Sequence, residues 1–272
     1  MCRVFGVSRS WYYTLRTRGE TKRQRNDKEL VPRIKAAFEA SEQTYGAGRI
    51  REDLLEQRIR ASKNRIWRLM QENGLHVKTT KRFRVTTNSD HKRPVAPNLV
   101  QQNFTSVAPD RLWTGDITYI WTAEGWLYLA VILDVFSRQI VGWSMNRRMT
   151  DDLVIAAFKN ALVRRRPVPR FIFHSDRGSQ YCSKHFRALV KDAGGVQSMS
   201  RSGCCYDNAI TESFFGTLKR ELVHHCSFTS RQEAQSRIFR YIEGFYNRRR
   251  RHSAIGYKTP VQYDQEFFKM AV

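Results

Sequence analysis

Negative charge is scarce in this sequence. Its 272 residues carry 25 Asp and Glu against 48 Lys and Arg, which gives a formal net charge of +23 and a pI near 10.3. So large an excess is more than solubility requires, and it suits a polyanion whose counterions are released when basic side chains bind it. Nucleic acid is therefore the first class of partner to consider. Residues 1–105, with 23 basic against 10 acidic side chains, are the most basic third.

Long hydrophobic runs and cysteines are also few. The longest apolar run, residues 127–136, is interrupted by Asp134 and is too short to cross a bilayer, so we expect no membrane partner. The start of the chain, MCRVFGVSRS, lacks the apolar segment of a signal peptide, which favours a cytoplasmic location. The five cysteines are odd in number and form no C-x-x-C pair, which argues against a disulfide framework and against a zinc ribbon.

The sequence predicts a helical region over residues 28–85. Within it, residues 49–57 have a helical apolar pattern, and SKNRIWRLMQENGL begins with Ser62 as an N-cap and stops at Gly74. Two short helices with a tight turn make a helix-turn-helix candidate, although helix pairs occur in every fold and only the local charge favours DNA here. The second helix would point four side chains outward to DNA: Lys63, Asn64, Arg65 and Arg68.

After a predicted linker over residues 86–108, the pattern changes to that of an α/β core over residues 109–225. RLWTGDITYIW, WLYLAVILDV and QIVGWSM are typical of three antiparallel strands, and a helix is predicted over residues 150–166. RFIFHSD is a fourth strand, which can lie parallel to the first because a helix intervenes. A helix near 184–193 and a strand near 196–199 complete a five-stranded mixed sheet flanked by helices. The order of the strands does not follow from the sequence.

Two aspartates mark a candidate site in this core. Asp116 lies within the first predicted strand and Asp176 ends the fourth, so pairing of these strands would place the carboxylates together at one sheet edge. Like charges a few Å apart repel, so either one carboxyl takes a proton or a cation lies between them. Oxygen ligands suit Mg²⁺ or Mn²⁺.

A third acid lies in the helical pattern CYDNAITESFFGTLKREL. Its apolar stripe leaves Asn208, Glu212 and Lys219 on the opposite side, and 3.6 residues per turn brings positions 212 and 219 onto one face. Taken singly, each acid also fits a structural role: Asp116 a strand end, Asp176 a turn, and Glu212 a solvated helix position. Their joint spacing favours a metal site beside a lysine that can bind phosphate.

This spacing resembles a known family. The order Asp116, Asp176, a gap of 35 residues and Glu212 resembles the pattern of retroviral integrases and bacterial insertion-sequence transposases with an RNase-H-like core. The resemblance extends over nearly the whole chain, to the second-reading-frame product of the insertion-sequence family closest to retroviral integrases. It is carried by WTGDITYI, YLAVILDVFSRQIVGW, HSDRGSQY, SRSGCCYDNAITESFFGTLKREL and YIEGFYNRRRRHSAIGYKTPVQY.

The resemblance implies a DNA transposase that performs metal-dependent cleavage and strand transfer at insertion-sequence ends. It assigns Asp116, Asp176 and Glu212 to a triad that binds two Mg²⁺ ions, with Mn²⁺ as a substitute, and Lys219 to transposon-end DNA, with Asn208 as a weaker candidate. The implied partners are double-stranded DNA, both transposon ends and target, and further copies of the chain assembled on that DNA. A bacterial, nucleoid-associated location follows.

Both ends of the chain extend this hypothesis. Residues 1–20 resemble the remnant of a helix-turn-helix encoded by an upstream frame, which implies that product as a partner or a fusion. A basic C-terminal helical extension, residues 226–272, carries the further candidate DNA contacts Arg248, Arg249, Arg250 and Arg251. Two alternatives stay open: an RNase-H-like structure-selective nuclease, and a non-catalytic DNA-binding regulator that assembles with the full-length transposase.

Overall fold

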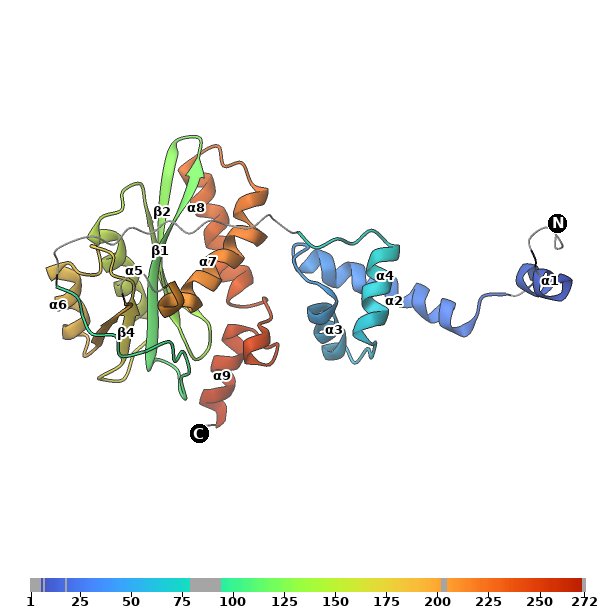
Figure 1. Cartoon of the computed structure of the whole chain (residues 1–272), viewed down its shortest axis with the longest axis horizontal. Helices are drawn as coiled ribbons and strands as arrows, with labels where there is room; N and C mark the ends of the chain where they lie inside the picture. Colours follow the sequence, from blue (N-terminus) through green and yellow to red (C-terminus); the bar gives the residue numbers. More distant parts are fainter. Residues whose placement is uncertain (1–5, 7, 18, 79–93, 202–204, 271–272) are drawn as a thin grey trace. The chain divides into compact units, whose positions relative to one another are not determined.

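The computed structural model of the chain describes residues 6, 8–17, 19–78, 94–201 and 205–270. Parts of all five predicted ranges, 1–20, 28–85, 86–108, 109–225 and 226–272, therefore lie outside the described residues. The chain divides into two compact units, Met1–Val77 and Lys78–Val272, each with its own buried core. The first unit is helical and the second is α/β (Figure 1).

In the first unit, helices pack through short apolar stripes. Ile50, Leu54 and Ile66 are fully buried where α3 and α4 meet. Ser62 accepts a hydrogen bond from the Arg65 N–H at 3.2 Å, which confirms the predicted N-cap. A helix before this pair, α2, was not predicted from the sequence. The described helices are α1 (Arg9–Thr17), α2 (Lys22–Ala40), α3 (Ala47–Glu56) and α4 (Lys63–Glu72).

The second unit is built on a five-stranded mixed sheet, as predicted. Its order is β3-β2-β1-β4-β5, in which β1, β2 and β3 form an antiparallel meander while β4 and β5 run parallel to β1. The strands are β1 (Leu112–Thr122), β2 (Gly125–Asp134), β3 (Ile140–Asn146), β4 (Ile172–Ser175) and β5 (Val196–Met199). Strand β1 is therefore central, with β2 on one side and the shorter β4 on the other.

Helices cover both faces of this sheet (Figure 1). Trp113 of β1 shares one core with Phe158 of α5 and Phe186 of α6. Thr114 alternates with Trp113 along the strand and points to the other face, where it meets α7. The helices of this unit are α5 (Asp151–Arg164), α6 (Lys184–Asp192), α7 (Ala209–Glu221), α8 (Arg231–Phe239) and α9 (Pro260–Met270), with a π-helical segment Arg240–Tyr246 and 3-10 turns Cys205–Asn208, Val223–His225 and Ser253–Ile255.

The C-terminal region is attached to the sheet by long-range polar contacts. The Asn247 side chain bonds both the N–H and the C=O of Ile140, at 2.9 and 3.0 Å. Arg165, which follows α5, donates two hydrogen bonds to Asp264 of α9, at 2.7 and 2.6 Å. Residues 226–270 therefore belong to the same compact unit as the sheet.

Residues 94–108, the described part of the predicted linker, are also held against the sheet. The Leu99 N–H donates to Ser198 Oγ at 2.9 Å, and the Met199 N–H donates to the Pro97 carbonyl at 3.3 Å. Val100 is buried. This segment therefore covers the outer edge of β5. Within the described chain, no helix is both long and apolar enough to cross a membrane.

A glycine sets how closely α5 approaches the sheet. A Cβ on Gly142 of β3 would lie 2.4 Å from the Ala157 carbonyl oxygen and 2.6 Å from the Ala161 Cβ, both in α5. These distances are shorter than van der Waals contact, so the helix lies directly on the strand backbone. Only glycine permits this approach, which buries the apolar side of α5.

Gly142→Ala is therefore expected to lower the free energy of unfolding by on the order of 1–3 kcal/mol, the usual cost of overpacking a core. Gly216→Ala in α7 is the matched control. Nothing lies within 4 Å of its added methyl group, so it should raise stability by up to about 1 kcal/mol through helix propensity. Urea denaturation of both variants checks the sign. Equal stability of Gly142→Ala and the wild type would contradict the close packing of α5 on β3.

Candidate active site

The parallel pairing of β1 with β4 brings two predicted site residues side by side. The last pair of this ladder is Gly115 with Ser175, and Asp116 and Asp176 are the next residues of the two strands. The Ile117 N–H donates to Asp116 Oδ1 at 2.7 Å. The prediction that these strands pair is confirmed, and both carboxylates lie at the end of one ladder.

The turn after β4 closes on the second of these carboxylates. The Gly178 N–H donates to Asp176 Oδ1 at 2.9 Å. A Cβ at position 178 would also lie 2.9 Å from that oxygen, and 3.2 Å from Gln180 Oε1. A side chain here would displace the Asp176 and Gln180 side chains, so the glycine that follows Asp176 and Arg177 leaves room for the carboxylate against the turn.

Helix α7 carries the third acid, and a pair of threonines sets its register. Thr211 Oγ1 donates to Thr114 Oγ1 at 2.8 Å. Thr211 precedes Glu212, and Thr114 lies two residues before Asp116, so this bond holds the first turn of α7 beside the acidic end of β1. Partial burial and the negative charge of Asp176 raise the pKa of Glu212. The three predicted acids therefore come from three elements and meet in one region.

Their charges act on one another. Burial raises the pKa of Asp116 well above its usual range, and the negative charges of Asp176 and Glu212 raise it further. The hydrogen bond from Ile117 and the positive charge of Lys219 oppose this shift without cancelling it. The Asp116 carboxylate is thus held in the protein at an electrostatic cost, which a bound cation would relieve.

Lys219 lies on the predicted face of α7, near the acids. Its Nζ is 5.1 Å from the centroid of the Tyr119 ring, which is a cation–π distance. Burial lowers the pKa of Lys219, while the negative charge of Asp116 opposes that change. The lysine therefore lies near both Asp116, within β1, and the aromatic ring of Tyr119 further along the same strand.

The acids do not close around a single point in this structure. Among the described residues, no three side chains of the His, Cys, Asp and Glu types converge closely enough to hold an ion. The donor chemistry nevertheless fits a hard divalent cation, because three carboxylates supply oxygen ligands whose mutual repulsion such an ion would remove. Metal binding here stays a prediction.

A buried polar network that the sequence did not suggest holds the start of α7. The two ring nitrogens of His174 lie 2.8 Å from Ser198 Oγ and 2.7 Å from the Asp207 carbonyl oxygen. Burial lowers the pKa of His174, so the ring is neutral; Nε2 then donates to the carbonyl and Nδ1 accepts from the serine. The Asn98 amide donates to Asp207 Oδ2 at 2.9 Å. The network fixes the turn before α7 against β4 and β5.

Two more buried side chains near the acids have polar atoms with no hydrogen-bond partner among the described residues. They are Tyr181, through its hydroxyl, and Asn208, through both polar atoms of its amide. Burial and the charges of Asp116 and Asp176 raise the pKa of Tyr181 well above its usual value. Asn208 lies one turn before Glu212, but it is buried and not on the outward face of α7 with Glu212, where it was predicted. An unsatisfied buried amide costs free energy unless a ligand satisfies it.

Of the four side chains of α4 that were predicted to point outward to DNA, two do so and two do not. Lys63 and Asn64 are exposed at its start. Arg65 and Arg68 are half-buried instead of pointing outward, since each forms an ion pair with Asp27 of α2, at 2.6 and 2.5 Å. The orientation predicted for these arginines is therefore wrong: an acid in the neighbouring helix holds them. Their contact with DNA is untested.

The C-terminal basic run is likewise divided. Arg248 and Arg249 are exposed. Arg250 is buried and forms an ion pair with Glu221, the last residue of α7, at 2.8 Å. Arg251 is buried and donates to the Tyr257 carbonyl at 3.1 Å. Two of the four arginines thus stabilise the unit, because buried guanidinium groups need partners, and only the first two are placed for a surface contact.

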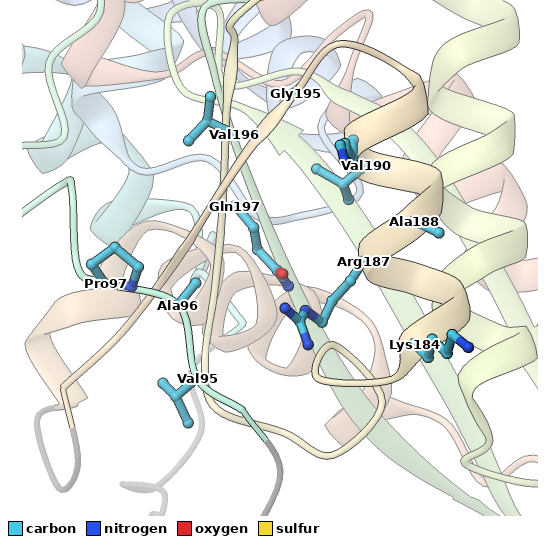
Figure 2. Close-up of a pocket in the computed structure, with 11 residues that line it drawn as sticks. Val95, Ala96, Pro97, Lys184, Arg187, Ala188, Val190, Gly195, Val196 and Gln197 are labelled. Carbon is cyan, nitrogen blue, oxygen red and sulfur yellow. The ribbon is translucent and has the colours of Figure 1, made fainter.

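A groove of about 640 Å³ lies elsewhere in this unit, between α6, β5 and residues 95–97 (Figure 2). The polar ends of Arg187 and Gln197 come together in it, between Val95 and Val190 (Figure 2). None of the three acids lines this groove. The candidate site is thus the open end of the β1–β4 ladder and not this groove.

Comparison with known proteins agrees with this architecture. An integrase core domain model matches residues 106–205, and a second integrase core domain model matches residues 212–268. An HTH-like domain model matches residues 24–83. The first match contains the whole sheet, and the second begins at Glu212.

Relatives match over the full chain. The insertion element IS600 uncharacterized 31 kDa protein of Shigella sonnei is 46% identical over 271 residues, which is 100% of both chains. Transposase InsF for insertion sequence IS3A of Escherichia coli (strain K12) is 43% identical over 98% of this chain and 93% of its own. A chain of the simian T-cell lymphotropic virus intasome, solved with PP2A regulatory subunit B56 gamma, is 17% identical over 75% of this chain and 67% of its own, with a TM-score of 0.50, and shares the fold.

The raised pKa of Asp116 predicts how stability varies with pH. The folded chain binds a proton at Asp116 more tightly than the unfolded chain, so without divalent cations this residue lowers stability as the pH rises from its usual pKa through the raised one. Asp116→Asn should therefore raise the melting temperature in EDTA at pH 8, and the gain should shrink as the pH falls toward 4. Asp192→Asn, at an exposed carboxylate, should show no such trend. A constant or negative difference for Asp116→Asn would contradict the electrostatic cost at this site.

Proposed function

The chain belongs to the insertion-sequence transposases with an integrase core and an HTH-like domain, and from this membership we propose that it cleaves DNA at insertion-sequence ends and transfers the cut strand to target DNA. The observation that supports the proposal is the pairing of β1 with β4, which puts Asp116 and Asp176 at the end of one ladder, while the charge of Asp176 acts on Glu212 of α7 and raises its pKa. A polynucleotidyl transferase needs such a cluster of acids on a basic surface.

Asp116, Asp176 and Glu212 would hold the divalent cations, Mg²⁺ or Mn²⁺, of this reaction. Bound cations would supply the positive charge that activates a water or a 3′-hydroxyl and neutralises the leaving oxygen at phosphorus. The protein's own contribution is positioning: the β1–β4 ladder aligns the two aspartates, and the bond from Thr211 to Thr114 sets α7 so that Glu212 completes the set.

Lys219 and Asn208 are proposed to position the DNA end. Lys219 carries a positive charge on the same helix face as Glu212, two turns or roughly 10 Å along α7. The amide of Asn208 is buried one turn before Glu212, so it would reach a nucleotide only if the residues that cover it moved on DNA binding. Both residues would then contact DNA beside the phosphate that reacts.

Recognition of the end is proposed for the HTH-like unit. Lys63 and Asn64 are the exposed residues at the start of α4, where recognition helices contact base edges. Arg65 and Arg68 would have to leave Asp27 to reach DNA, so their replacement would also loosen α4 from α2. Assembly of several copies on paired ends, participation of an upstream-frame product and residence at the nucleoid complete the proposal.

Asp176→Asn and Glu212→Gln are each expected to lower strand transfer of a pre-cut transposon end at least a hundredfold, because each removes a metal-binding oxygen. Retention of the same DNA in a gel-shift assay should stay within about twofold of wild type, since phosphate contacts remain. A second readout does not depend on activity. Mg²⁺ should raise the melting temperature of the wild type and not of either variant.

One gel separates the alternatives. Transfer products with Mn²⁺ identify a transposase, nicks without transfer a nuclease, and retention without cleavage a regulator. Full transfer by either acid variant would remove that residue from the triad.

Lys219→Ala is expected to weaken binding of a pre-cut end and to reduce the slope of log affinity against log salt by about one, the effect of losing one phosphate contact. Lys159→Ala, an exposed lysine of α5 on the opposite face of the sheet, should leave the slope unchanged. Titrations at several salt concentrations measure both. Equal slopes for Lys219→Ala and the wild type would place the DNA away from this part of α7.

A further inference from the structure

Three aromatic side chains form a group near the turn of the β1–β2 hairpin, where Tyr119 and Trp121 each contact Trp126. Trp121 and Trp126 are direct cross-strand partners, and Tyr119 lies two residues before Trp121 on β1. The Trp126 ring stands edge-to-face with both neighbours, at 4.8 Å and 75° from Trp121 and at 5.1 Å and 84° from Tyr119. These three residues are called the aromatic cluster.

The aromatic cluster is exposed to solvent. Tyr119, Trp121 and Trp126 are 37%, 59% and 43% accessible. They lie on the same sheet face as Trp113 and Ile132, which α5 covers, but the hairpin extends beyond that cover (Figure 1). A contiguous patch of large apolar rings on the surface of a soluble protein marks a binding site more often than chance exposure does.

The aromatic cluster lies a few residues beyond Asp116 along β1. The β1–β4 ladder stops at Gly115, so from Asp116 onward β4 no longer borders β1. Tyr119 follows Asp116 by three residues, and the Lys219 Nζ lies over its ring at 5.1 Å. Asp116 and Tyr119 point to opposite faces of β1, and the ammonium group of Lys219 lies near both of them.

The combination of aromatic rings and a nearby ammonium group indicates which class of ligand would bind. Aromatic faces stack on nucleobases of any sequence, and a nearby ammonium group holds the attached phosphate. An edge-to-face contact uses at most one face of one ring, so the faces of Trp121 are not all occupied within the cluster. The net charge of +23 favours a polyanionic ligand over a neutral apolar one. A base inside a duplex offers only its edges, so stacking on several rings favours a nucleotide whose base has left the duplex.

We propose that the aromatic cluster is a stacking site for a nucleobase that has left the duplex next to the scissile phosphate, with Lys219 on the phosphate of that nucleotide. The inference rests on the proposed function for the identity of the DNA, and it adds that the DNA is bound with its end frayed. Unpairing costs least at a duplex end, and stacking on an aromatic side chain recovers on the order of tenfold in affinity per base. The site would thus favour ends that are already open.

The test compares two DNA ends of one sequence, a fully paired duplex and the same duplex with two unpaired terminal nucleotides, one of them 2-aminopurine. The full chain should bind the unpaired end roughly tenfold more tightly at fixed salt, with quenching of the 2-aminopurine fluorescence by stacking. Trp121→Leu should abolish this preference and the quenching while leaving affinity for the paired end unchanged. Trp121→Phe, which keeps a ring, should restore most of both.

Trp67→Leu is the matched control, because Trp67 is equally exposed, at 60%, but lies on α4 of the other unit. It should leave both the preference and the quenching at wild-type values. Equal weakening of paired and unpaired ends by Trp121→Leu would overturn the proposal. A wild type that binds both ends equally would also overturn it. If Trp121→Leu loses a dimer and binds both ends equally more weakly, the cluster is instead a contact with a second copy of the chain.

Strand transfer measured in parallel separates the two proposals. A preference that depends on Trp121, in a chain that transfers no strand, supports the stacking site and counts against the transposase function. Normal transfer with no effect of Trp121→Leu on either DNA end supports the function and removes the stacking site.

Discussion

Repulsion among three carboxylates is the constraint on which the rest of this structure depends. Asp116, Asp176 and Glu212 gain nothing for folding by lying together, since burial and mutual charge raise the pKa of Asp116 well above its usual range. A chain with so few acids could have kept them apart. The scaffold places them in neighbouring elements, and under the proposed function this placement would serve a cation-dependent reaction on phosphate.

The placement of the three acids depends on hydrogen bonds between uncharged groups of the surrounding fold. The neutral ring of His174 links Ser198 to the turn at Asp207, so α7 starts beside β4 and β5. The Thr211 hydroxyl then sets α7 against β1. A fully buried acid outside the site, Asp134, shows the contrast. Burial raises its pKa to about 6, but its oxygens accept hydrogen bonds from Ser137 and from the Asp110 N–H, so its role is structural.

The large positive charge is divided between two tasks. Some arginines neutralise acids inside the protein: Arg65 and Arg68 hold Asp27, Arg165 holds Asp264, and Arg250 holds Glu221. These ion pairs join helices that are distant in sequence. Other cationic side chains, such as Lys63 and Arg248, are exposed at the surface and can contact phosphate. Net charge therefore indicates the class of partner without locating the surface that binds it.

The sequence by itself determined the local elements and the identity of the acids. Alternating apolar residues predicted the strands, Ser62 marked the start of α4, and the spacing of Asp116, Asp176 and Glu212 within five ordered motifs indicated the family. These signals are local, because hydrophobic period and capping act within a few residues, and motif order needs no three-dimensional information.

Only the tertiary structure decided the order of the strands, the pairing of the charges and the exposure of the hairpin aromatics. The hydrogen bonds from Arg165 to Asp264 join residues 99 positions apart, and the contact of His174 with Asp207 joins residues 33 positions apart. Local sequence patterns extend over only a few residues, so they cannot predict such pairs. Trp121 and Trp113 occupy the same face of one strand and have the same chemistry. One is exposed and the other buried because α5 covers the sheet near Trp113 and does not reach the end of the hairpin.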